Sequence, residues 1–115
     1  MRVEQDGAET CEVASNGGFV LVRVPVRVTG EVRGAAAVFR YQIGGFVGRE
    51  TSWPRPAAHG TTLTFRIPVE LFRERQRLTL EVLRTDTPAG RETLWATRYD
   101  VSWVGGIPAV IPVPE

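Results

Sequence analysis

Several residue types that support common protein chemistries are missing or rare in this chain. Its 115 residues include one cysteine, one histidine and no lysine. A single cysteine excludes an internal disulfide, so a small domain held together by disulfides is not expected. No apolar run approaches the roughly 20 residues of a membrane span, and residues 1–6 lack the apolar segment of a signal peptide. We therefore expect one core built without disulfides or metals, and no membrane partner.

The charge of the chain is nearly balanced. Fourteen arginines face thirteen acidic residues, which gives a formal net charge of +1. A protein that binds nucleic acid usually carries a clear basic excess on one face. We therefore expect no nucleic-acid partner, and instead a protein partner or a homo-oligomer.

The residues suited to catalysis or metal binding are scattered along the sequence. His59 and Cys11 are far apart, whereas a zinc site needs about four ligands. No spacing links His59 to a nucleophile and an orienting acid, and Cys11 is expected to be a small buried hydrophobe. One acidic group lacks the ligand spacing of a calcium loop and predicts a solvated face; it comprises Glu4, Asp6, Glu9 and Glu12. The sequence predicts no catalytic residue, no metal site and no cofactor.

The strongest pattern is the two-residue alternation typical of half-buried strands. In Phe19–Thr29, every second residue from Val20 to Val28 is valine, which predicts a strand with its valine face inward. Pro25 lacks an amide hydrogen, so we expect a sheet edge or a bulge there. Glu70–Arg77 breaks the alternation and is compatible with one or two helical turns. Four further segments alternate in the same way: 37–43, 61–69, 78–82 and 93–104.

These segments together indicate the fold class. One or two short N-terminal strands around Val3, Cys11 and Val13 bring the count to six or seven, and turn residues separate the strands. We predict an all-β fold: a single immunoglobulin-like β-sandwich of about six to seven antiparallel strands, with a small β-barrel as the alternative. The sandwich is expected over residues 1–104, and residues 105–115 are expected to form an extended, apolar, proline-rich C-terminal tail or arm.

The connection from Gly44 to Gly60 is long for a compact β domain, and such loops often carry function. Tryptophan and arginine are enriched at the centres of protein interfaces, and neighbouring prolines lower the entropy lost on binding. We therefore predict Phe46, Trp53 and Arg55 as protein-contact residues. The alternative is that Phe46 belongs to a short extra strand while Trp53 folds back over the core.

The tail after Gly105 and Gly106 is apolar and contains three prolines, so it cannot form a helix and favours an extended path. Because an apolar tail is unfavourable in water, we expect it to pack on its own domain or on a neighbouring molecule. The predicted contact residues of the tail are Ile107, Val110, Ile111 and Val113.

Two functional hypotheses follow from these features. The first is a non-enzymatic structural or assembly protein that docks on, or cements, a larger protein assembly through its tail and long loop. Phage virion accessory proteins and appendage subunits provide the analogy, which rests on fold style alone. The second is a carbohydrate- or peptide-binding module built around the Trp53 loop.

Overall fold

The computed structural model describes residues 1–30, 36–53, 60–88 and 90–114, and it contains strands but no helix in these residues. The strands are β1 (Arg2–Gln5), β2 (Thr10–Val13), β3 (Phe19–Thr29), β4 (Ala37–Ile43), β5 (Phe46–Val47), β6 (Thr51–Trp53), β7 (Thr61–Pro68), β8 (Arg77–Thr87), β9 (Gly90–Val104) and β10 (Ile107–Pro112). Beyond the five alternating strands and the short N-terminal strands predicted from the sequence, the structure adds β5 and β6, which are only two and three residues long, and β10, which lies in the segment predicted as an extended tail.

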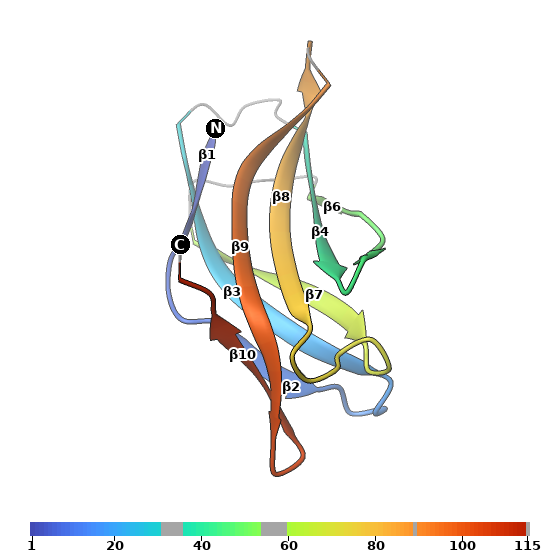
Figure 1. Cartoon of the computed structure of the whole chain (residues 1–115). Coiled ribbons are helices and arrows are strands. Elements are labelled where there is room, and N and C mark those ends of the chain that lie inside the picture. The colour runs from blue at the N-terminus through green and yellow to red at the C-terminus, as the bar shows by residue number, and fades with distance from the viewer. Residues whose placement is uncertain (31–35, 54–59, 89, 115) are drawn as a thin grey trace.

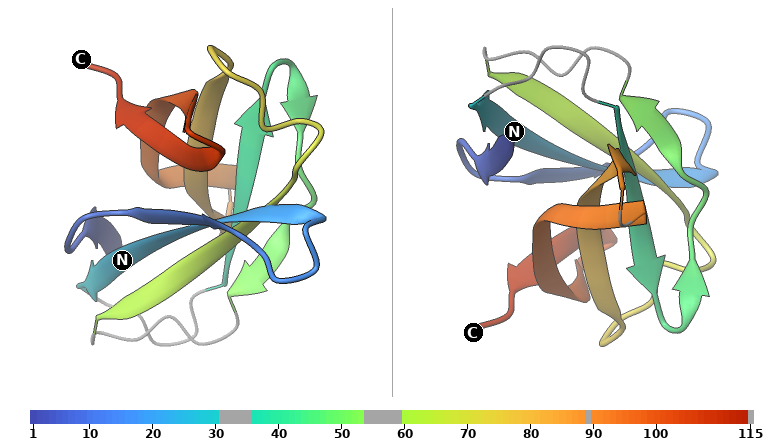
Figure 2. Two further views of the ribbon diagram at one scale, coloured as in Figure 1. Left: turned by 90° about the horizontal axis from the view of Figure 1, so that it is seen from below. Right: turned by 90° about the horizontal axis from the view of Figure 1, so that it is seen from above.

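The strands form two antiparallel sheets that pack face to face as a β-sandwich (Figures 1 and 2). In sheet I, β1 and β2 share one side of β3 while β7 pairs with the other side. In sheet II, the order is β10-β9-β8-β4, with β5 and β6 both on the outer side of β4. This is the β-sandwich predicted from the sequence: β3 is the central strand of sheet I and β7 lies at its edge, whereas β4, β8 and β9 are the inner strands of sheet II. No hydrogen-bonded ladder joins the two sheets among the described strands, so these strands do not close into a barrel.

The core lies between the inner faces of the two sheets. The valine face predicted for β3 is confirmed, since all five valines from Val20 to Val28 are completely buried. Leu63, Phe65 and Ile67 of β7 extend this layer, and Leu78, Leu80 and Val82 of β8 face it from the second sheet. Alternation along each strand therefore places the apolar side chains in the core.

Pro25 lies in the middle of β3 and has strands on both sides. Its carbonyl accepts a hydrogen bond from the Asp6 amide at 2.8 Å. The N–H and C=O of one strand residue point to the same side, so the amide hydrogen that Pro25 lacks would point there too. On that side β1 ends at Gln5 and β2 begins at Thr10. Pro25 therefore lies beside the gap between β1 and β2, not at an edge or bulge of β3 itself, and its missing amide hydrogen costs little there.

The segment predicted to contain helical turns, Glu70–Arg77, forms a series of tight turns instead. The amides of Leu71 and Phe72 each bond to a carbonyl three residues back, at 3.0 and 3.2 Å, but no helical ladder follows. Phe72 is buried against Trp103, with the rings edge to face at 5.9 Å. The Trp103 indole donates to the Phe72 carbonyl at 2.7 Å. Burial of this aromatic pair fixes the path of the connection more strongly than local helix propensity does.

Candidate functional site

The C-terminal segment 107–112 is extended and belongs to the sandwich as strand β10, antiparallel to β9. Val110 packs against the core, and Val113 continues the ladder by donating to the Arg98 carbonyl at 3.1 Å. Ile107 and Ile111 point the other way and are 66% and 53% exposed. Among the predicted tail contacts, only Ile107 and Ile111 therefore present large apolar surfaces to solvent.

The tip of the β9–β10 hairpin projects beyond the rest of the sandwich (Figure 1). Gly105 and Gly106 have φ values of 58° and 79°, the left-handed pair that a two-residue type I′ turn needs. This turn places Val104, which is 67% exposed, directly opposite Ile107. Alternation brings Ile111 to the same face, opposite Asp100. We call Val104, Ile107 and Ile111 the hairpin strip.

The long connection after β4 contains two short strands, and its predicted contact residues have different environments. Phe46 is in β5 and is 47% exposed, whereas Trp53 ends β6 and is only 8% exposed within the core cluster. Burial removes Trp53 from the contact surface for which it was predicted, because β6 pairs with β4 and places Trp53 opposite Ala37. Arg55 lies outside the described residues.

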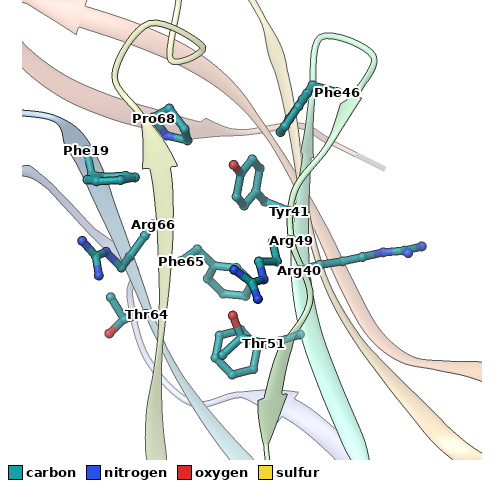
Figure 3. Close-up of a pocket in the computed structure, with 11 residues that line it drawn as sticks. Phe19, Arg40, Tyr41, Phe46, Arg49, Thr51, Thr64, Phe65, Arg66 and Pro68 are labelled. Atoms are coloured by element: carbon teal, nitrogen blue, oxygen red, sulfur yellow. The ribbon is translucent and has the colours of Figure 1, made fainter.

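A cleft of about 490 Å³ separates β7 of sheet I from β4, β5 and β6 of sheet II. Figure 3 shows aromatic side chains from both sheets around it and Arg49 pointing into it. The lining residues are Phe19, Phe39, Arg40, Tyr41, Phe46, Arg49, Thr51, Thr64, Phe65, Arg66 and Pro68. Of the predicted contact residues that the structure describes, only Phe46 lines this cleft.

The wall of the cleft at Tyr41 depends on a glycine. The Gly48 amide donates to the Tyr41 carbonyl at 2.8 Å, and the Tyr41 ring covers Gly48 so closely that an added Cβ would clash with the ring. Burial raises the pKa of the Tyr41 hydroxyl above its ordinary value, and the nearby Glu70 carboxylate adds to the rise. The Gly44–Gly48 segment, which does not match a phosphate loop, thus gives the Tyr41 ring room to pack.

The three arginines of the cleft differ in their partners. Arg40 points away from the cleft (Figure 3) and binds Glu81 at 2.6 Å and Glu50 at 3.3 Å. Arg66 lies over the Phe19 ring, 4.6 Å from its centroid, which is a cation–π contact. Neither Arg49 nor Arg66 forms an ion pair with any residue that the structure describes.

A network of charged groups fixes the connection that carries Arg49. Glu50 bonds to both Arg40 and Arg91, and Gln42 donates to the Glu81 carboxylate at 2.8 Å. Glu81 is buried, so these donors offset the cost of removing its charge from water. Because Glu50 follows Arg49 in the chain, the network holds the backbone beside this wall of the cleft.

The N-terminal acids take part in contacts at the surface, as expected of a solvated face. Asp6 pairs with Arg27 at 3.4 Å, and Glu12 pairs with Arg23. In the described ranges, no group of three or more acidic, histidine or cysteine side chains is arranged to hold a metal ion. His59 lies outside the described residues, and the described part of the chain has no helix that could cross a bilayer.

Sequence reasoning missed most of the cleft because its residues come from strands that are distant in the chain. Arg66 is in β7 of sheet I and Arg49 is in the connection between β5 and β6 of sheet II, and in the sequence each resembles an ordinary exposed arginine. The available signal was the alternation in β7, which places Thr64 and Arg66 outward. Alternation does not reveal which strand edge stays unpaired.

Comparisons with known proteins gave no match: no family model, no curated protein and no solved structure is significantly similar to this chain.

Proposed function

We propose that this chain is a non-enzymatic assembly protein, a β-sandwich that docks on a larger protein assembly through the outer face of its β9–β10 hairpin. The observation that carries the proposal is the hairpin strip, in which Val104, Ile107 and Ile111 are each more than half exposed on one face. Apolar side chains gathered at a projecting tip are costly in water and gain free energy when a partner covers them.

The neighbouring polar residues fit a protein partner. Ser102 and Asp100 lie on the same face of β9 as Val104, opposite Ala109 and Ile111 of β10. A small apolar centre with polar groups beside it is the usual arrangement of a protein contact. Virion accessory proteins and appendage subunits use stand-alone sandwiches in this way, an analogy of architecture only.

The burial of Trp53 disfavours the second hypothesis in its carbohydrate form. A sugar ring stacks on an exposed aromatic face, and Trp53 contributes to the core instead. Fluorescence quenching by a glycan that is lost in Trp53→Phe would contradict this view.

Self-association of the purified chain tests the form of this role in which the larger assembly consists of copies of this protein. Light scattering at increasing concentration is expected to show species larger than the monomer for the native chain. The double variant Ile107→Thr, Ile111→Thr should remain monomeric, because threonine keeps β-propensity while removing apolar surface. Val47→Thr is the matched control, since Val47 is exposed on β5 at the other edge of sheet II. A native chain that stays monomeric throughout would contradict assembly through copies of this protein.

A further inference from the structure

The strand β7 has one paired edge and one free edge, and the register shows which backbone groups lie on each. The Pro25 carbonyl accepts from the Asp6 amide, on the side of β1. The backbone groups of the odd-numbered residues of β3 therefore point to β1 and β2, and those of the even-numbered residues point to β7. The pairs Val22–Phe65 and Val20–Ile67 therefore exchange hydrogen bonds. The bond from the Val69 amide to the Gly18 carbonyl, 3.1 Å, continues the same series.

The backbone groups of Thr64 and Arg66 consequently point away from β3. No described strand pairs with that edge, because β7 has β3 as its sole partner in the described sheets. Thr64 and Arg66 also line the cleft. The free donors and acceptors of β7 thus lie at the wall of a cavity, where an extended chain can reach them.

The cleft supplies apolar contacts for one face of such a chain. Successive side chains of a strand point to opposite faces, so a strand added to β7 would direct every second side chain between the two sheets. There it would meet Phe39, Tyr41 and Phe46. Phe39 and Phe65 already pack edge to face at 5.3 Å, and their rings form an apolar surface at the base of the cleft.

The charges of the cleft favour acidic side chains on the incoming chain. Arg49 points into the cleft, and Arg66, whose guanidinium lies over the Phe19 ring of β3, also lines it (Figure 3). Neither has a carboxylate partner among the described residues, whereas Arg40 is occupied by Glu81 and Glu50. Carboxylates bind such guanidinium groups by charge-assisted hydrogen bonds.

From these observations we propose that the cleft between β7 and β4–β6 is a second binding site, at which an extended segment of a partner protein with alternating acidic and apolar residues adds to the free edge of β7. Its backbone bonds to Thr64 and Arg66, its apolar side chains enter the aromatic cleft, and its carboxylates bind Arg49 and Arg66. The site deepens the proposed assembly role by defining the chemistry of a partner, and it is separate from the hairpin strip.

Synthetic peptides as long as the eight-residue β7 test this site on the intact chain. A peptide that alternates valine with glutamate is expected to bind in a calorimetric titration, while the same peptide with lysine in place of glutamate is not. Replacing alternate residues by proline should abolish binding, because backbone hydrogen bonds are lost. On binding, hydrogen exchange of the Thr64 and Arg66 amides should slow, whereas the Phe65 amide is already protected.

Variants assign the contacts. The double variant Arg49→Gln, Arg66→Gln should weaken binding of the acidic peptide by about tenfold or more. Arg98→Gln is the matched control, since Arg98 is an exposed arginine on β9. The pair Ile107→Thr, Ile111→Thr should leave peptide binding unchanged, which separates failure of this site from failure of the hairpin strip.

Three results would overturn the proposal. If the acidic peptide does not bind, the proposed site at β7 is contradicted directly. Equal binding of glutarate and of the peptide, without slowed exchange at Thr64 and Arg66, would show a simple anion site. Self-association of the peptide-free chain that Arg49→Gln abolishes would show that a second copy occupies the cleft instead of a partner.

Discussion

The two lateral edges of the sandwich differ in how they end. At one edge β10 packs against β2 of the other sheet, and the buried Pro108 and the half-buried Val110 face the interior. At the other edge β7 and the β5–β6 connection stay apart, and the cleft lies between them. We call these the closed edge and the open edge.

The difference shows what is needed to close a sandwich. The closed edge has a full six-residue strand, which the Gly105–Gly106 turn sends back along β9. At the open edge, β5 and β6 are two and three residues long and remain paired with β4. Short strands, arginines and Pro68 also discourage uncontrolled pairing of a free edge. The arginines at the open edge disfavour non-specific strand pairing, while the aromatic side chains of the cleft can bind a partner strand that carries acidic and apolar residues.

The largest effect is expected from removing the closed edge. A chain that ends after Val104 loses β10 and uncovers the edge of β9 and the part of β2 against which β10 packs, so we expect a loss of at least about 3 kcal/mol in the free energy of unfolding. Urea denaturation followed by circular dichroism measures this loss. A chain that ends after Val113 is the control and should match the native midpoint. An unchanged urea midpoint in the chain that lacks β10 would show that pairing with β10 does not stabilise the edge of β9.

The thiol of Cys11 on β2 reports on the same edge. Burial, and secondarily the charge of Glu12, raises the pKa of Cys11 from the ordinary 9.0 to about 11. At pH 8 the reactive thiolate should thus be about a hundredfold rarer in the folded chain than in the unfolded chain, and alkylation by iodoacetamide correspondingly slower. Equal rates in buffer and in concentrated urea would contradict this expectation.

The raised pKa of Cys11 also makes the stability of the fold fall as the pH rises into the alkaline range. Between pH 9 and about 11 the folded chain holds the thiol proton while the unfolded chain releases it. The contribution of the thiol to stability is therefore complete below pH 9 and is lost as the pH rises toward 11. Cys11→Ala should remove this part of the alkaline loss.

A smaller effect is expected at the open edge from Arg40→Leu. The substitution leaves the buried Glu81 carboxylate with Gln42 as its remaining side-chain donor, so we expect a loss of about 2 kcal/mol in unfolding free energy. The double variant Arg40→Leu, Glu81→Leu should recover much of this loss, because the unpaired charge is gone. Thermal unfolding of both variants measures it; a double variant weaker than Arg40→Leu would contradict the argument.

The sequence was most informative where burial alone decides the structure. The valine alternation of β3 predicted both the strand and its inward face, because side-chain direction in a strand follows from local geometry. The Gly105–Gly106 pair likewise favours a tight turn, and the extended path after it was expected. The glycine pair did not show whether the tail would pack on its own domain; in the structure it does so, because β10 pairs with β9.

The candidate sites depended on contacts that no local pattern contains. Trp53 and Phe46 lie in the same connection, yet pairing with β4 buries one and exposes the other. Arg49 and Arg66 become neighbours of one cleft when the two sheets pack. By itself the sequence determined five of the longer strands, their inner faces and the all-β class, which follow from alternation and turn chemistry. Only the tertiary structure decided which edges close and which stay free, because strand pairing between distant segments depends on the packing of the whole core.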